Sequence, residues 1–357
     1  MKIVFIQGGL GNQIFQYAFF RYLIKKGYRR VYLDGAAGFI SKHGGFELKR
    51  LFPSIAADQR VLPYWKARPP YLLGELLRLI FRLDLRTDEE QPKGRKLWWK
   101  AHWQEYRYPE YVREEIVKSL EFIPIEDEKN VKILQLITST NAVSIHVRRG
   151  DYLQPHMRPM FGDICSTDYY HKAIGYIRGK VENPQFFVFS DDPDWVKKNL
   201  SPECAVYVDW NRGKDSFRDM QLMSCCKHHI IANSSFSWWG AWLSPYPEKL
   251  VVCPAKWFHN FPVEKVDRLL PPDWHRIGQR NPNVSLLVDD DISEDELRPV
   301  MQQKYADFEI IRTTRQPKGN HVFRLLKSEL PAYKNKKYLI KKMVRYFQMT
   351  NSNLPPD

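Results

Sequence analysis

The feature that most constrains this chain is a repeated alternation of short apolar segments with helical segments in its second half. The segments expected as strands are residues 142–147, 185–190, 205–208, 229–233 and 249–253. The segments expected as helices between them are residues 167–180, 194–199, 216–226 and 238–243. Strands that alternate with helices are typical of a parallel sheet with helices on both faces. The pattern therefore predicts a doubly wound α/β domain.

The N-terminus opens in the same way. Residues 2–6 predict a buried strand, a glycine turn follows, residues 12–26 predict a helix, and residues 31–34 predict a second strand. This β-α-β order indicates a second parallel sheet. We therefore expect two Rossmann-like domains, residues 1–138 and 139–277, that face a cleft, followed by a small C-terminal extension of unknown role, residues 278–357.

The extension differs in composition from the rest. It contains a strand-like segment at residues 284–288, an acidic helix start at residues 293–296 and a basic tail. The tail's cations are Lys334, Lys336, Lys337, Lys341, Lys342 and Arg345. They suit an anionic surface, but a solvated helix face is the favoured interpretation. Residues 289–291, all Asp, suit a metal ion or, more simply, a solvated turn.

The formal net charge of +14 favours anionic partners: nucleotide phosphates, nucleic acid or an acidic membrane face. Residues 72–83 combine leucines with arginines, which suits a helix on a membrane surface, although packing on the protein's own core is the favoured interpretation. No run reaches the roughly 18 apolar residues of a spanning helix. The number of cysteines is odd, five, and no pair has C-x-x-C spacing. These features argue against a disulfide framework and against a zinc site, and they favour a cytoplasmic location.

The first polar motif is the glycine turn at residues 8–13, between a strand and a helix start. Backbone N–H groups at such a turn can bind an anion. The dinucleotide pattern G-x-G-x-x-G is absent, because Ile14 occupies the third glycine position after Gly9 and Gly11. NAD binding is therefore discounted.

The second motif, residues 146–152, follows a predicted strand, where ligands bind in open α/β sheets. Arg148 and Arg149 suit a diphosphate, because a guanidinium is always charged and can contact two oxygens. In transfer from a nucleotide sugar this diphosphate is the leaving group, and its charge grows in the transition state. The alternative is a surface cluster of ion pairs with Asp151.

Two further motifs follow strands. Asp191 can accept hydrogen bonds from a nucleoside. Asp192 and Asp194 form a D-x-D pattern, which in other proteins binds a divalent metal ion and here could instead cap a helix. Because two arginines are available for the diphosphate, we expect no metal ion.

Residues 233–242 place small hydroxyl side chains at a predicted helix start. This arrangement suits an anion, or a simple N-cap before a tryptophan-rich core helix.

Together, in this order and spacing, Gly-Gly-Leu-Gly-Asn-Gln, His-Val-Arg-Arg-Gly-Asp-Tyr, Ser-Asp-Asp and Asn-Ser-Ser-Phe-Ser-Trp-Trp-Gly resemble the α-1,2-fucosyltransferases. The resemblance covers residues 1–277. It implies a glycosyltransferase of the two-Rossmann GT-B type that needs no metal or other cofactor. It also implies inverting transfer of fucose from GDP-fucose, bound in the C-terminal half, to the 2-hydroxyl of a terminal galactose on a glycan.

The resemblance also implies roles for individual residues. Arg148 would hold the β-phosphate, Asp191 would contact the guanosine, and Asn12 would approach the donor across the cleft. The other residues expected at the donor site are Gly9, Gly11, His146, Arg149, Ser234, Ser235 and Phe236. For the base that accepts the acceptor's proton, Asp151 is the first candidate, and His156 and Glu47 rank second.

Alternatives stay open at this point. The arginine motif binds the leaving group, so another GDP-sugar or another linkage is possible. A non-catalytic binder of carbohydrate or nucleic acid is a further alternative, but polar residues at successive strand ends argue against it.

In the extension, residues 282–287 and 303–311 resemble the opening of a second glycosyltransferase family, which has a single-domain fold. The extension is too short to complete that domain.

Overall fold

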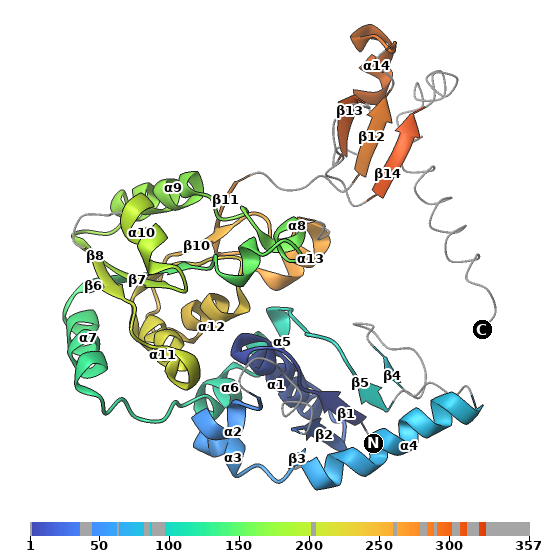
Figure 1. Cartoon of the computed structure of the whole chain (residues 1–357), viewed down its shortest axis with the longest axis vertical. Coiled ribbons are helices and arrows are strands. Elements are labelled where there is room, and N and C mark those ends of the chain that lie inside the picture. Colours follow the sequence, from blue (N-terminus) through green and yellow to red (C-terminus); the bar gives the residue numbers. More distant parts are fainter. Residues whose placement is uncertain are drawn as a thin grey trace. The chain divides into compact units, whose positions relative to one another are not determined.

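The computed structural model describes residues 2–35, 45–62, 64–81, 86–87, 97–200, 205–259, 263–278, 284–288, 291–301, 308–312 and 321–325. These residues form three sheets (Figure 1). The chain divides into two compact units. The first comprises Met1–Trp257 and Lys265–Gly278, and the second comprises Phe258–Glu264 and Gln279–Asp357. The first unit holds two of the sheets.

The N-terminal sheet consists of five short parallel strands. In sheet order they are β3 (Val61–Leu62), β2 (Val31–Asp34), β1 (Lys2–Phe5), β5 (Trp98–Trp99) and β4 (Arg86–Thr87). The helices of this part are α1 (Leu10–Lys25), α2 (Leu48–Leu51), α3 (Pro53–Ala56), α4 (Tyr64–Phe81), α5 (Arg107–Tyr111) and α6 (Arg113–Ser119). Helix α1 is followed by Gly27, whose φ of +89° suits glycine. The predicted β-α-β opening is confirmed.

The second sheet has six parallel strands. In sheet order they are β11 (His275–Ile277), β10 (Val251–Pro254), β9 (His228–Ile230), β6 (Asn141–Val147), β7 (Pro184–Ser190) and β8 (Ala205–Val208). Its helices are α7 (Glu128–Ser139), α8 (Arg158–Phe161), α9 (Thr167–Arg178), α10 (Pro193–Asn199), α11 (Phe217–Cys225), α12 (Ser235–Leu243) and α13 (Val263–Leu269), with 3-10 turns η2 (Asp151–Leu153) and η3 (Gly213–Asp215). Two parallel α/β sheets were predicted, and this fold class is confirmed.

The order of strands in the second sheet reverses next to β6. Strand β7 pairs with one side of β6 and β8 pairs with β7, whereas the next strand, β9, pairs with the other side of β6. In open parallel sheets such a reversal leaves a crevice at the carboxyl ends of the two central strands. The loops after β6 and β9 are therefore the places where a ligand is expected.

Helices α1 and α12 pack together and join the two sheets of the first unit. Phe15 of α1 lies 4.5 Å from the ring of Trp238 and 5.0 Å from that of Trp239, centroid to centroid. All three side chains are fully buried. The tryptophan-rich segment predicted as a core helix therefore packs between the two halves of the unit.

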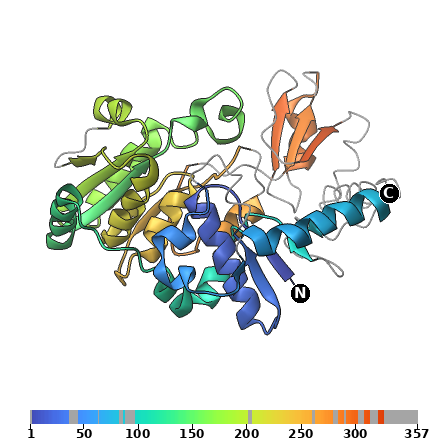
Figure 2. The same ribbon diagram turned by 60° about the horizontal axis from the view of Figure 1, so that its bottom comes forward.

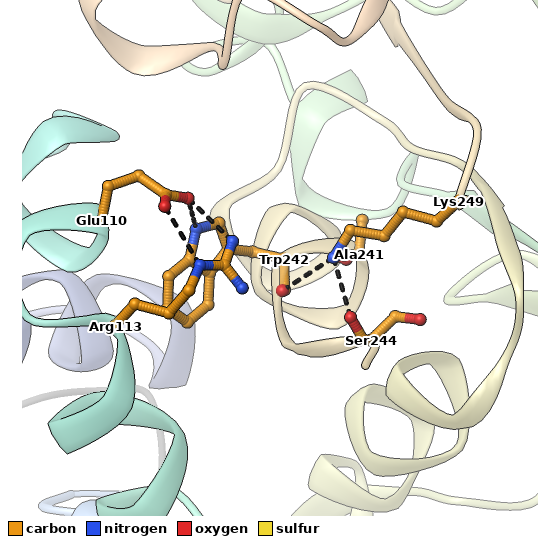
Figure 3. A network of polar contacts seen from close by, with 6 residues as sticks. All are labelled: Glu110, Arg113, Ala241, Trp242, Ser244 and Lys249. Atoms are coloured by element: carbon orange, nitrogen blue, oxygen red, sulfur yellow. Dashed lines mark hydrogen bonds and ion pairs between the residues drawn. The ribbon is translucent and has the colours of Figure 1, made fainter. Parts of the chain in front are cut away.

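Polar contacts hold α12 at its C-terminal end (Figure 3). The Lys249 ammonium donates to the backbone carbonyls of Ala241, Trp242 and Ser244 at 2.8–2.9 Å. Trp242 donates its indole N–H to Glu110 of α5 at 2.7 Å, and Arg113 binds the same carboxylate through two nitrogens. The last carbonyls of α12, which have no partner within the helix, are thus satisfied by one cation.

The second unit contains a separate three-stranded parallel sheet, in the order β13 (Phe308–Arg312), β12 (Val284–Val288) and β14 (His321–Leu325), with helix α14 (Glu294–Met301). The strand predicted at residues 284–288 is confirmed. Ser293 caps α14 by accepting from the Glu296 N–H, as the acidic start suggested. The basic tail lies outside the described residues, as do residues 289 and 290 of the aspartate segment, for which a solvated turn was favoured over a metal site.

Helix α4 departs from expectation. We expected its leucines to pack on the core, but Leu72, Leu73, Leu76 and Leu79 are all at least half exposed. Within the described part of the chain, no helix is both long and apolar enough to cross a bilayer.

Candidate functional site

The predicted motifs meet at the carboxyl edge of the second sheet. Strand β6 lies between β7 and β9, so the loops that follow these three strands are neighbours. They carry Arg148 and Arg149, then Asp191 and Asp192, then Ser234. This is the reversal point of the sheet, where the fold itself favours a ligand.

Arg148 lies between two carboxylates. Its Nη2 is 2.8 Å from Oδ1 of Asp151, and its Nη1 is 3.0 Å from Oδ2 of Asp191. Burial opposes the charge of this guanidinium, but Asp191 and Asp151 outweigh it, so the pKa of Arg148 is raised. One-third of the side chain is exposed, which leaves part of it accessible to a ligand. The two carboxylates therefore hold a charged, oriented guanidinium at the sheet edge.

Arg149 is fixed by three contacts from the loop after β7 and from α10. Its backbone N–H donates to Oδ1 of Asp191 at 2.9 Å, its Nε lies 3.2 Å from Oδ2 of Asp192, and its guanidinium lies 3.8 Å from the ring centroid of Trp195. Gly150 permits this approach, since a Cβ there would lie 2.8 Å from Oδ2 of Asp191. Asp191 thus engages both arginines, whereas the resemblance implied a contact with guanosine.

His146 is buried near the end of β6, two residues before Arg148. Burial, assisted by the charge of Arg148, lowers its pKa to about 3. The imidazole is therefore neutral at ordinary pH and adds no positive charge. Its ring lies 5.7 Å from that of Phe236, so these two predicted site residues are brought together.

The start of α12 forms the other side of the site. Ser234 is the N-cap and accepts from the Phe236 N–H at 3.3 Å. The preceding Asn233 is buried and donates to the carbonyls of Phe161 and Trp257. Tyr152 donates its hydroxyl to the Asn233 carbonyl at 3.2 Å, which ties the arginine loop to the start of α12.

The N-terminal glycine motif meets this same helix start. A Cβ on Gly11 would lie 2.5 Å from the carbonyl carbon of Ser235 and 2.7 Å from the Phe236 nitrogen. Gly11 is therefore a close-packing residue. Gly9, the N-cap of α1, has no atom within 4 Å of such a Cβ. The Asn12 carboxamide accepts from Gln104 at 2.7 Å, a partner that the sequence did not indicate.

A pocket of about 220 Å³ opens beside the arginines. Its lining includes Arg148, Arg149, Tyr152, Cys165, Trp195 and Asn233. Pockets that enclose a drug-sized ligand measure roughly 300–1,000 Å³, so this one suits part of a nucleotide sugar. Tyr152 and Asn233 belong to sequence motifs in which no role was expected of them, and no sequence signal pointed to Trp195 or Cys165.

The three candidates for the base lie in different settings. Asp151 contacts Arg148, as described. His156 is exposed on the turn after η2. Glu47 is buried beside the glycine turn, where its backbone N–H donates to Gln13 and its carboxylate accepts from the Leu10 N–H. Burial raises the pKa of Glu47, and the nearby Arg50 opposes this only in part.

The D-x-D pattern is built as a helix cap. Asp192 is the N-cap of α10 and accepts from the Trp195 N–H at 3.2 Å. Among the residues that the structure describes, no three His, Cys, Asp or Glu side chains are grouped as metal ligands.

Residues 90–277 match the family described as "Glycosyl transferase family 11". An Escherichia coli protein named alpha-1,2-colitosyltransferase is 33% identical over 292 residues, which cover 76% of this chain and 97% of that protein. The O-antigen biosynthesis glycosyltransferase WbnK of Escherichia coli is 45% identical over 122 residues, 34% of this chain and 40% of WbnK. Human galactoside alpha-(1,2)-fucosyltransferase 1 is 31% identical over 104 residues, 29% of this chain and 28% of that enzyme.

The family match covers the arginine motif, the Asp191 loop and the start of α12, which are the parts that the structure gathers at one sheet edge. The colitosyltransferase match extends over nearly the whole of that relative. The chain therefore belongs to glycosyl transferase family 11, the family of α-1,2-fucosyltransferases that its motifs resemble.

Proposed function

We propose that this glycosyltransferase moves fucose from GDP-fucose to the 2-hydroxyl of a terminal galactose on a glycan, with inversion and without a metal ion. The observation that carries the proposal is the setting of Arg148, which Asp151 and Asp191 orient at the reversal point of the sheet. A fixed guanidinium at that position suits a diphosphate whose negative charge increases as it leaves.

In this proposal the bond between the fucose C1 and the β-phosphate oxygen breaks, and the galactose 2-oxygen forms the new bond to C1. Arg148 binds the β-phosphate and stabilises the departing GDP. Arg149 and the start of α12, with Ser234 and Ser235, complete the site for the diphosphate. Neutral His146 and Phe236 provide an uncharged wall.

The proton of the galactose hydroxyl passes to a carboxylate. Asp151 stays the first candidate because it lies on the same turn as the phosphate arginine. Glu47 is the second, because its raised pKa suits proton uptake and it lies beside the turn that packs on Ser235.

The test is release of GDP by the purified protein from GDP-fucose with lactose as acceptor, in the presence of EDTA. We expect lactose-dependent release and a 2-linked product. Arg148→Ala should lose nearly all of this activity and most GDP affinity measured by calorimetry. Lys172→Ala, which removes an equal charge from an exposed pair with Asp168, should retain both. GDP binding that survives Arg148→Ala would contradict the proposed site.

A second candidate is transfer of a different GDP-sugar, favoured by the 33% identity to a protein named colitosyltransferase. The arginine site binds the leaving group and is compatible with either sugar. Competition between GDP-fucose and other GDP-sugars for turnover, measured as relative kcat/KM, distinguishes the two.

A further inference from the structure

Helix α4 packs on the N-terminal sheet through a glycine. A Cβ added at Gly74 would lie 2.6 Å from Cζ3 and 2.7 Å from Cη2 of Trp98, a buried side chain of β5. Figures 1 and 2 show α4 as the long light-blue helix next to the N-terminal sheet. The Gly74 contact defines which face of α4 is turned inward.

The opposite face of α4 is apolar and exposed. Five large aliphatic side chains are between 50% and 69% exposed: Leu72, Leu73, Leu76, Leu79 and Ile80. At about 100° per residue they fall within an arc of roughly 120°, and Gly74 lies roughly opposite its centre. The described residues include five other exposed large hydrophobic side chains, Tyr28, Tyr111, Val117, Leu136 and Met160, and these lie on other elements. Contiguous apolar surface of this kind marks an interaction site.

The charge of this region indicates the partner. Helix α4 contains three cations (Lys66, Arg68 and Arg78) and one acid (Glu75), and the whole chain carries a formal net charge of +14. An aliphatic stripe within a basic helix is the pattern of helices that lie in the plane of a bilayer interface. A two-fold contact with a second copy would instead bring each basic segment against its own equivalent.

From this stripe we infer that α4 docks the protein on an anionic lipid surface, with Leu72, Leu73, Leu76, Leu79 and Ile80 inserted between headgroups. We infer that the helix lies in the plane of the bilayer surface, because it contains charged residues and is not apolar enough to cross the bilayer. In this arrangement the inserted aliphatic side chains attach the protein to the lipid, and the cations of α4 favour acidic headgroups. This inference concerns a different surface from the arginine site and does not depend on the sugar transferred.

The test is co-sedimentation of the full chain with vesicles of equal phosphatidylglycerol and phosphatidylcholine, and with phosphatidylcholine alone. We expect binding to the acidic vesicles, weakened by salt. Leu76→Glu/Leu79→Glu should lower the bound fraction at least about tenfold, since it places two charges in the stripe. Val117→Glu/Leu136→Glu makes the same change on α6 and α7 and should bind as the wild type does. Circular dichroism verifies that all variants are folded.

Leu72→Ser/Leu73→Ser gives a second, uncharged test and should also weaken binding. Three outcomes would overturn the inference. The first is equal vesicle binding by the wild type and both α4 variants, and the second is no binding by the wild type. The third is a dimer of the wild type, seen by light scattering without lipid, that the α4 variants abolish, since the stripe would then bind a second copy.

Discussion

Gly11 and Ser235 approach so closely that no side-chain carbon fits between them. The two residues lie in the first turns of α1 and α12, 224 positions apart, and a Cβ on Gly11 would lie 2.5–2.6 Å from the Ser235 carbonyl group. Since Ser235 lies at the proposed diphosphate site, this contact joins the N-terminal sheet to the site.

Gly11→Ala is therefore expected to force the two helix starts apart. Overpacking a rigid contact costs about 1–3 kcal/mol, and the clash here is with backbone atoms that cannot rotate away. We expect a lower free energy of unfolding in urea and weaker GDP binding by calorimetry. Gly9→Ala is the control for stability, because its Cβ meets no atom within 4 Å. Equal stability of the two variants would contradict the packing role of Gly11.

Asp151→Asn and Glu47→Gln together identify the base. If Asp151 accepts the proton, Asp151→Asn should lower kcat by about 10²–10⁴-fold, while Glu47→Gln stays within a few-fold of the wild type. The reverse result assigns the base to Glu47, whose raised pKa would place the acidic limb of the wild-type kcat profile above the usual range of a glutamate. The measurement is kcat against pH at saturating GDP-fucose. A small effect of both substitutions would exclude both carboxylates as the base.

Asp219 should make stability depend on pH. Burial raises the pKa of this carboxyl to about 7 despite a hydrogen bond from Asn211 at 2.8 Å. Between about pH 4 and 7 the folded chain thus binds a proton at Asp219 that the unfolded chain has lost, so this group's contribution to stability falls as pH rises, by at most about 1.4 kcal/mol per pH unit.

Asp219→Asn removes that titration. Its free energy of unfolding relative to the wild type should increase between about pH 5 and about pH 8, measured in urea at each pH. Asp168→Asn, at an exposed helix position, should show no such trend. A relative stability of Asp219→Asn that is independent of pH would refute the assignment.

Lys249→Met tests the cap on α12. The substitution keeps the length of the side chain but removes the donor shared by three carbonyls. Leaving buried carbonyls unpaired costs about 1–3 kcal/mol each, so we expect a loss of at least about 2 kcal/mol in urea unfolding. Lys172→Met, at an exposed position of α9, is the matched control and should change stability little.

Most strands of the second sheet could be predicted from the sequence, because parallel strands that are buried on both faces are short apolar runs. Their order within the sheet was not predicted. The strand at residues 205–208 and the strand at residues 284–288 were predicted with the bounds observed. The arginine and serine motifs were located for a similar reason, since polar residues directly after such strands lie at the carboxyl edge.

What the sequence could not predict depends on contacts between distant segments. Gly11 had the pattern of a phosphate-binding glycine, and only the position of Ser235 reveals its packing role. Asp191 suited a nucleoside, but the fold places it against Arg148 and Arg149. For α4, packing on the core was favoured over a surface helix, because leucine spacing shows that one face of a helix is apolar but does not show what covers that face.

The pairing of β6 with β9 also governs when the site can form during synthesis. Val143 pairs with His228, 85 positions later in the chain. At a translation rate of about 5–20 residues per second, the segment that completes this edge of the sheet is synthesised roughly 4–16 s after Arg148. Until α12 follows, Phe15 of α1 lacks the Trp238 and Trp239 rings that pack on it in the folded chain. The nascent chain therefore has a defined interval in which chaperone binding or aggregation competes with assembly of the two halves.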